Sequence, residues 1–354
     1  MTTLARLARG AGKGFDTLVF QAFVLPAGPS GDETAATAQR GRFAEIAAAV
    51  RRVPVPVVLQ DPVSAPLSPL AREILHDENL VRVPGTELGL AAISHAVRWT
   101  ARRAELLETG RSSPRQVAVD PSLIGRPLTE AEGLDLMEKA GVPVVPHIVV
   151  RSVDEAVAAA SRLGGPVAMK ISSVDVLHKS DIGGVVLGVT GADAVAAAYD
   201  QITTRVAERL PEARLGGVLV APMRTGGVEL VLGVNRDAVW GPVLLVGLGG
   251  VFVEVFGDVA LRPLPLSRTE VLDMLAELRG APLLKGARGS EPVDLESLVD
   301  AVLALADLAH ALGDDYQSIE VNPLRADASG VEALDSLVEW NDNHADDQHG
   351  GEEA

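Results

Sequence analysis

The chain of 354 residues contains no cysteine and only 3% aromatic residues. The first absence excludes disulfides, cysteine-ligated zinc, thiolate catalysis and acyl thioesters on the protein itself. The second means that the core must be built mainly from alanine, valine and leucine. The sequence also lacks an apolar run of membrane-spanning length, and residues 1–16 contain no continuous apolar segment of a signal peptide. We therefore expect a soluble cytoplasmic protein.

Positive charge is also scarce, since 31 Lys and Arg face 48 Asp and Glu, for a formal net charge of −17. Such a balance disfavours nucleic acids and anionic membrane surfaces as partners. A hydrophobic content of 47% is typical of a folded α/β protein, and the length allows two or three domains. If this acidic chain handles a phosphorylated ligand, single lysines near glycines become informative.

Strands alternate with helices in the first 107 residues. Apolar runs at 15–25, 53–60 and 80–83 predict strands, and the segments 32–52, 67–77 and 86–107 predict helices. This order implies a small parallel sheet of about three strands. So thin a domain, here assigned to residues 1–107, could be incomplete or lean on a partner. The polar stretch 108–127 reads as a linker.

A second unit is expected over residues 128–340. Thr129 and Glu132 form a capping-box pattern, and Gly141 is placed to end the helix that follows. An acidic tail at 341–354 has the composition of a disordered segment. Further strands are expected at 145–150, 216–223, 228–236 and 242–256, and further helices at 153–163, 192–210, 268–278 and 294–312.

The stretch Pro166–Val189 is the most informative part of the chain. An apolar run ends at Lys170, a polar segment with His178 follows, and Gly183 and Gly184 precede a second β-branched run. The pattern predicts two strands joined by a long loop. A strand-end lysine beside a glycine pair suits a polyphosphate, although no Walker A sequence is present. The histidine could carry a phosphoryl group on a ring nitrogen. The alternative is a lysine that extends into solvent at the sheet rim and a solvated loop histidine.

A second polar group is predicted near the C-terminus. Glu320 and Asn322 are two positions apart in a predicted strand, so their side chains point to the same side. An expected hairpin turn at about 325–330 would bring Asp335 back beside them. Few oxygen ligands of this kind suit Mg²⁺ held jointly with nucleotide phosphates. A strand that merely ends in a polar turn explains the same residues equally well.

Taken together, these segments resemble the ATP-grasp part of the NDP-forming acyl-CoA synthetases, a family that includes ADP-forming acetate–CoA ligases and relatives of succinyl-CoA synthetase. The resemblance spans about residues 123–340, and residues 15–105 look more weakly like a flavodoxin-like domain. The runs that carry it are LHKSDIGGVVLGV, GGVELVLGVNRD, GPVLLVGLGGVFVEVFGDVALR, PLLKGARG and IEVNPL. The implied fold is α/β, with an ATP-grasp domain of two α+β subdomains after a small, incomplete flavodoxin-like parallel domain.

The resemblance also implies roles for residues of this chain. It implies ATP or ADP and Mg²⁺ as ligands, with coenzyme A as a co-substrate reached through a partner. By position, the implied nucleotide contacts are Lys170, Gly183, Gly184, Val220, Ala221 and Glu229, the implied metal ligands are Asn322 and Asp335, and the implied catalytic residues are the phosphate-relaying His178 and Glu320, which would position the phosphohistidine.

Two departures from the family pattern affect the functional prediction. Ala221–Pro222 stands where the family's hinge has Gln-Glu, and no segment of this sequence resembles the family's CoA-binding or primary phosphohistidine domain. We therefore expect the nucleotide-binding component of an acid–CoA ligase (ADP-forming), which converts acid, CoA and ATP to acyl-CoA, ADP and phosphate with an α-type partner. The alternatives are a stand-alone ATP-grasp carboxylate ligase and a non-catalytic nucleotide-binding regulatory subunit.

Overall fold

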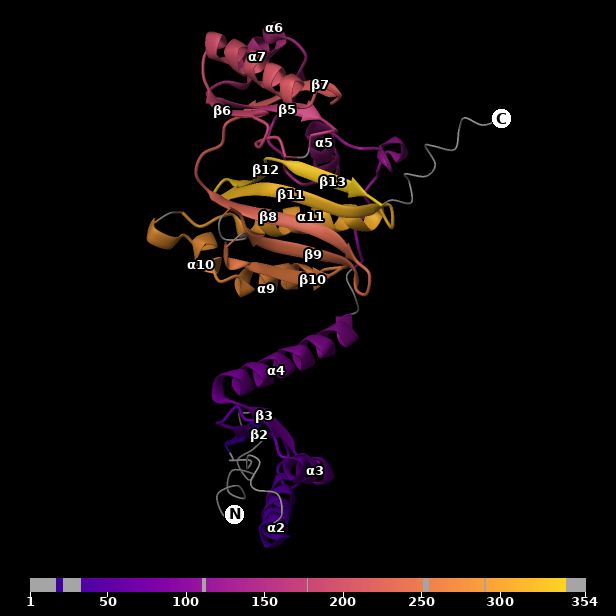
Figure 1. Cartoon of the computed structure of the whole chain (residues 1–354), viewed down its shortest axis with the longest axis vertical. Coiled ribbons are helices and arrows are strands. Elements are labelled where there is room, and N and C mark those ends of the chain that lie inside the picture. Colours follow the sequence, from indigo (N-terminus) through magenta and orange to yellow (C-terminus); the bar gives the residue numbers. More distant parts are fainter. Residues whose placement is uncertain are drawn as a thin grey trace, which may run out of the picture. The chain divides into compact units, whose positions relative to one another are not determined.

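The computed structural model describes residues 17–21, 33–109, 113–176, 178–250, 255–289 and 291–341. The chain divides into two compact units, Met1–Gly110 and Arg111–Ala354, and each is described by itself (Figure 1). Within the described residues, no helix combines the length and the apolar character that a membrane crossing requires.

The first unit is built on a small parallel sheet. Its three strands lie in the order β1-β2-β3, and both pairings are parallel, so the expected sheet is confirmed. Phe43, Leu59 and Ile74 form part of a small core between the sheet and its helices. The strands are β1 (Leu18–Gln21), β2 (Val57–Asp61) and β3 (Val81–Pro84), and the helices are α2 (Glu33–Val50), α3 (Pro69–Asp77) and α4 (Thr86–Thr109).

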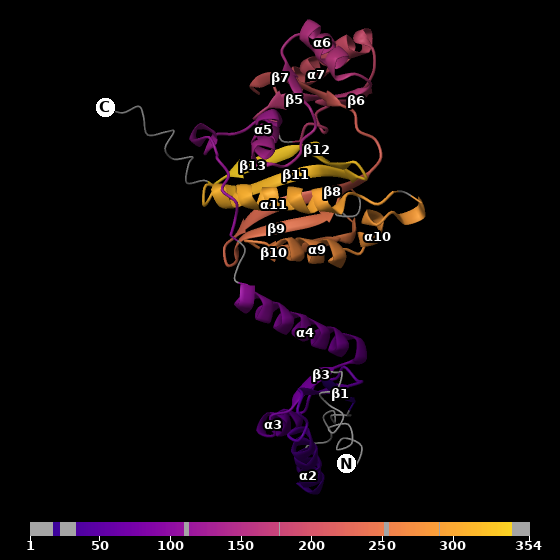
Figure 2. The ribbon, with the colours of Figure 1, turned by 180° about the vertical axis from the view of Figure 1, so that it is seen from behind.

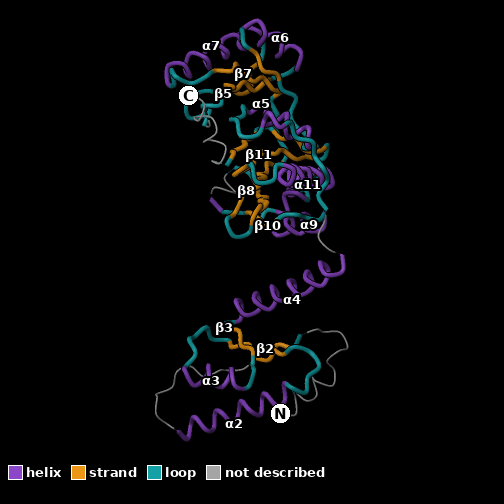
Figure 3. The backbone as a smooth tube through the Cα atoms, turned by 90° about the vertical axis from the view of Figure 1, so that its right-hand side faces the viewer, coloured by secondary structure: helices purple, strands orange, loops and turns teal. Residues whose placement is uncertain are grey.

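The second unit contains two antiparallel sheets, of which the smaller has four strands in the order β4-β7-β5-β6. Helices α6 and α7 pack against each other and against this sheet (Figure 3). The strands are β4 (Ile148–Val150), β5 (Val167–Ser173), β6 (Val185–Val189) and β7 (Leu215–Pro222), and the helices are α6 (Val153–Leu163) and α7 (Ala192–Arg209).

The larger sheet has the order β10-β9-β8-β11-β12, and β13 also pairs with β11. Seen from behind, α9 and α11 lie across its strands (Figure 2), and α5 packs against α11 and β13. The strands are β8 (Val228–Asp237), β9 (Gly241–Leu248), β10 (Val259–Pro263), β11 (Tyr316–Asp327), β12 (Gly330–Ala333) and β13 (Ser336–Trp340), and the helices are α5 (Glu130–Ala140), α9 (Arg268–Glu277), α10 (Ala281–Leu284) and α11 (Leu295–Ala311).

Strand β7 joins the cores of the two sheets. Val218 and Val220 are buried in the core of the smaller sheet, whereas Leu219 and Ala221 are buried in the core of the larger sheet. Successive side chains of a strand point to opposite faces, so one strand can serve both cores. This shared strand fixes the two sheets relative to each other.

Several segments lie differently from their expected bounds. Helix α4 continues to Thr109, and Val117 and Ile124 of the expected linker pack against the core of the larger sheet. The domain boundaries at 107 and 127 therefore stay predictions. The strand expected at 242–256 ends at Leu248, and residues 251–254 lie outside the described residues, as does the expected tail beyond residue 341.

The start of α5 matches the capping box of the sequence. The Thr129 hydroxyl accepts a hydrogen bond from the Glu132 N–H, and the Glu132 carboxylate accepts one from the Thr129 N–H at 2.8 Å. Gly141 ends the helix with a φ of 98°, a left-handed conformation that glycine adopts without strain. The cap fixes the backbone position of Glu130, the first residue of the helix.

We expect Thr129→Ala to destabilise the second unit by about 1 kcal/mol, because the first turn of α5 loses its side-chain cap. For a unit of this size the midpoint of thermal unfolding should fall by roughly 2–4 °C. Calorimetry of the purified variant measures the shift. Thr204→Ala, on the exposed face of α7, is the control and should leave the midpoint unchanged. An equal shift in both variants would contradict the assigned role of the cap.

Candidate functional site

Lys170 lies on β5 of the smaller sheet and contacts α5 and the residues just before β13 of the larger sheet. Its Nζ donates hydrogen bonds to Glu130 Oε1 at 2.6 Å, to the Leu334 carbonyl oxygen at 3.0 Å and to Asp335 Oδ2 at 3.0 Å. The side chain is only 13% exposed, so its ammonium does not extend into solvent. The expectation of a strand-end lysine is wrong, because β5 continues for three residues beyond Lys170, to Ser173.

Lys179, from the loop after β5, joins the same group. Its Nζ lies 3.0 Å from Glu130 Oε2 and 3.8 Å from Asp335 Oδ1. The short contact is an ion pair without hydrogen-bond alignment, because Glu130 Oε2 has no hydrogen-bond partner. We call Glu130, Lys170, Lys179 and Asp335 the four-charge cluster. Its two cations and two anions give a formal net charge of zero. Pairing of this kind offsets the free-energy cost of burying charged groups.

Electrostatics within the cluster keep Lys170 protonated. Burial alone would lower the pKa of its ammonium, but the negative charges of Glu130 and Asp335, together with hydrogen bonds to both, raise the pKa above its ordinary value. Lys170 is therefore a fixed positive charge at neutral pH. A lysine held in this state can bind an anion but cannot act as a base.

The loop of residues 174–184 holds Lys179 in place through its glycines. The Gly184 N–H donates to the Lys179 carbonyl oxygen at 2.8 Å, and the Gly184 carbonyl accepts from the Ile171 N–H at 2.7 Å. A Cβ on Gly184 would lie 2.7 Å from Ile171 Cγ2, and Gly183 has a φ of 70°. The glycine pair is thus required for this turn, and its contact with phosphate stays a prediction.

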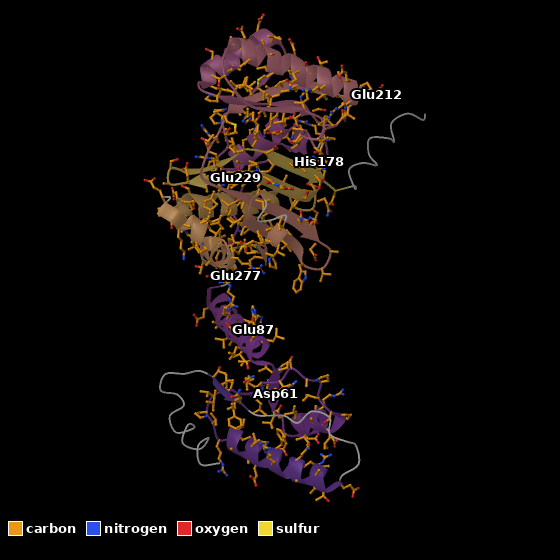
Figure 4. All side chains as sticks on the ribbon, turned by 60° about the vertical axis from the view of Figure 1, so that its left-hand side comes forward. Asp61, Glu87, His178, Glu212, Glu229 and Glu277 are labelled. Carbon is orange, nitrogen blue, oxygen red and sulfur yellow. The ribbon has the colours of Figure 1, made fainter. Side chains whose placement is uncertain are left out.

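His178 lies next to Lys179 but outside the cluster. Its side chain is exposed, and we find no hydrogen bond or ion pair for it within the described part of the chain. Figure 4 labels it among the side chains of the second unit. The ring is therefore accessible, and its role as a phosphoryl carrier stays a prediction.

An ion pair anchors the start of this loop. The Asp175 carboxylate accepts hydrogen bonds from the Arg214 backbone N–H at 2.7 Å and from its guanidinium at 2.7 and 3.1 Å. The side-chain and backbone hydrogen bonds of Arg214 lower the pKa of Asp175 to about 2. Arg214 immediately precedes β7, so the pair ties the loop to the strand that both cores share.

The polar group predicted near the C-terminus is brought together as expected. The Asn322 amide donates to Glu320 Oε1 at 3.0 Å, and the Asn322 backbone N–H donates to the Asp335 carbonyl at 3.3 Å. The expected hairpin is present as the antiparallel pairing of β11 with β12, and β13 continues that pairing beyond Asp335. Asp335 is thus next to Asn322 and also bonded to Lys170.

The donor set fits a magnesium ion that is shared with phosphate. The described residues contain no group of three or more His, Asp or Glu side chains that could hold a metal alone. The Asn322 amide nitrogen donates to Glu320, which leaves its amide oxygen for a metal ion, and this oxygen and the Asp335 carboxylate stay the predicted ligands. Mg²⁺ typically takes one or two protein oxygens and completes its shell with phosphate and water.

The other predicted contacts lie along β7 and β8. Val220 and Ala221 are buried, so only their backbones could meet a ligand. The pairing of β7 with β4 ends at Val220, and beyond it the described register pairs β7 only with β5. Glu229, also labelled in Figure 4, is exposed near the start of β8, and no contact joins it to the four-charge cluster in the described interactions.

Sequence reasoning missed Glu130 as part of this site. It identified Lys170 and Asp335, but the sequence marks Glu130 only as an acid in the first turn of a helix, where acids are common. No local signal shows that this carboxylate is 1% exposed and lies between two lysines.

The second unit has clear relatives among known proteins. A family model described as ATP-grasp domain matches residues 125–339, more than half of the chain. Acetate–CoA ligase [ADP-forming] I of Archaeoglobus fulgidus is 40% identical over 207 residues, which is 58% of this chain and 30% of that protein. The beta subunit of acetate–CoA ligase [ADP-forming] I of Pyrococcus furiosus is 35% identical over 224 residues, 63% of this chain and 96% of that subunit.

Solved structures show the same likeness. One is the acetyl-coenzyme A synthetase 1 of Ca. Korarchaeum cryptofilum in complex with coenzyme A, Ca-AMPCP and HgCl⁺, with 36% identity and a TM-score of 0.58 over 60% of this chain and 93% of that chain. Another holds coenzyme A and Mg-AMPPCP, with its phosphohistidine segment pointing towards the nucleotide site, at 33% identity and a TM-score of 0.53 over 61% and 94% of the two chains.

We expect the Asp175 carboxyl to titrate near pH 2 in the folded protein, as the Arg214 hydrogen bonds require. The depressed pKa adds stability above the ordinary value of 3.8, and this contribution is lost as the pH falls from there towards 2. Carboxyl-carbon NMR measures the titration directly. In Arg214→Ala the pKa should return towards 3.8, and a wild-type value near 3.8 would contradict the pair.

Proposed function

Because this chain belongs to the ATP-grasp family of the ADP-forming acyl-CoA ligases, we propose that it is the nucleotide-binding, β-type component of such a ligase. The reaction would combine a carboxylic acid, CoA and ATP to give acyl-CoA, ADP and phosphate through a phosphohistidine. The proposed ligands of this chain are ATP or ADP with Mg²⁺.

The observation that supports the proposal most is the bond between Lys170 and Asp335. It joins a cation of the smaller sheet to a predicted metal ligand next to β13 of the larger sheet. These two residues are 165 positions apart in the chain. A fixed ammonium facing a potential magnesium ligand is the arrangement that neutralises polyphosphate from two sides. The likeness to a relative solved with Mg-AMPPCP supports the same interpretation.

In this proposal the phosphates bind at the four-charge cluster. Lys170 and Lys179 donate to phosphate oxygens, and Asp335 and Asn322 supply oxygens to Mg²⁺, which offsets phosphate charge when bound. The adenine would lie along the backbone of β7 near Ala221, where the pairing with β4 has ended. Exposed His178 would accept the γ-phosphoryl group on a ring nitrogen as the bond to ADP breaks, or would perform the reverse transfer.

The remaining parts of the reaction are assigned to a partner. This chain spans 30% of the length of the Archaeoglobus ligase that it matches, and 96% of the length of the Pyrococcus beta subunit. We propose that an α-type chain supplies the CoA site, the acyl pocket and the primary phosphohistidine. Glu320, bonded to Asn322, would position that phosphohistidine when it reaches the nucleotide.

One observation favours a regulatory subunit as the second candidate. Pro222 ends β7 next to the proposed adenine position, and proline has no N–H to donate to a base. A chain that binds nucleotide weakly and transfers nothing would retain the Lys170 contacts. Phosphoryl transfer to His178 distinguishes the two functions.

We expect calorimetry to show Mg-ATP binding to the wild-type chain and a loss of roughly 10- to 100-fold in affinity for Lys170→Ala, which removes a charge-assisted hydrogen bond. Thermal unfolding of each sample confirms that the variant is folded. Absence of Mg-ATP and Mg-ADP binding by the wild-type chain would contradict both candidate functions.

Incubation with γ-labelled ATP and Mg²⁺, with or without an α-type chain, should give an acid-labile label that is absent from His178→Ala. His76→Ala is the control, because that histidine is exposed in the first unit and should leave the label unchanged. Nucleotide binding without label under both conditions would contradict the ligase and support the regulatory subunit.

A further inference from the structure

We propose that Glu130 is a positioning residue that holds Lys170 and Lys179 side by side as a preformed phosphate clamp, with Asp335 as the exchangeable partner of both lysines. This inference rests on the proposed function and names how the same site is prepared for its ligand. No reacting group touches Glu130 in this scheme, because it acts through the two ammonium groups.

The contacts of Glu130 carry the first step. Its two carboxylate oxygens face different lysines, with Oε1 2.6 Å from Lys170 Nζ and Oε2 3.0 Å from Lys179 Nζ. The two cations come from different segments, one from strand β5 and one from the loop that follows it. Two ammonium groups so close would repel each other in a poorly solvated place, and a carboxylate between them removes that cost.

Burial separates the two acids of the cluster. The Glu130 side chain is 1% exposed, whereas that of Asp335 is 28% exposed. Glu130 is also fixed through its backbone, because its carbonyl accepts a hydrogen bond from Ser336 Oγ at 3.2 Å. At Gly133, in the next turn of α5, an added Cβ would lie 2.5 Å from the same Ser336 Oγ, so the helix sits close against β13.

Charge balance gives the second step. At rest, two cations face two anions, and no net charge is left for a ligand. When Asp335 turns to a divalent cation that arrives with the nucleotide, each lysine loses one partner, and the cluster gains net positive charge for the phosphates. Glu130 cannot follow Asp335, because it is buried and faces away from solvent. The lysines therefore stay together while their second partner is exchanged.

A comparison of the affinities for Mg-ATP and AMP, which differ in their number of phosphates, tests this role. We expect Glu130→Gln to lower the affinity for Mg-ATP roughly 10- to 100-fold. A loss of this size is typical when a residue that orients the side chains in direct contact with a bound ion is removed. The affinity for AMP, measured by displacement of a fluorescent ATP analogue, should change less than twofold, because we place the clamp at the β- and γ-phosphates, which AMP lacks. Lys179→Met should show the same selective loss, and the double variant should lose less than the sum of the two single variants.

The control is Asp61→Asn in the first unit, which also removes a buried carboxylate (4% exposed) from a cation, Arg82, at 3.0 Å. It should bind Mg-ATP like the wild type. If Glu130→Gln does not fold, Glu130→Asp retains the charge and should still lose ATP affinity selectively.

Normal ATP affinity in folded Glu130→Gln, or an equal loss for ATP and AMP, would overturn the proposal. Failure of the wild-type chain to bind Mg-ATP would instead contradict the proposed function itself, so the two failures are distinguishable.

Discussion

The site depends on one buried carboxylate, Glu130, and on the two cations that pair with its charge. A carboxylate with 1% of its side chain exposed needs close cations to offset the cost of its burial, and Lys170 and Lys179 are those cations. The positions of the two lysines then constrain the elements around them. Lys170 requires β5 to pass over the start of α5, and Lys179 requires the turn that Gly183 and Gly184 close. Asp335 completes the charge balance from the larger sheet.

These contacts between the smaller sheet and the residues around the larger sheet require the two sheets to keep a fixed relative position. Strand β7 provides it, because Leu219 and Ala221 face one core while Val218 and Val220 face the other. The Asp175–Arg214 pair then ties the loop that carries His178 and Lys179 to the start of the same strand. One strand thus positions both the loop with His178 and the charges of the four-charge cluster.

The elements were largely predictable from the sequence because their signals are local. The capping box at Thr129, the glycine at Gly141 and the β11–β12 hairpin each depend on residues within a few positions of one another. The site was predictable in part, since Lys170 and Asp335 stand in recognisable runs. Glu130 was not, because its partner Lys170 lies 40 positions away and burial of the pair is a tertiary property. Lys170 lies inside β5 because Ser172 and Ser173, which carry no strand signal in the sequence, continue the pairing with β7.

A crystal structure of this chain with Mg-AMPPCP tests the central claim most directly. The account predicts that Lys170 and Lys179 donate to phosphate oxygens while both remain within hydrogen-bond distance of Glu130, and that Asp335 has left the lysines for the metal ion. A nucleotide bound elsewhere, or one bound while Lys170 keeps its hydrogen bond to Asp335, would contradict it.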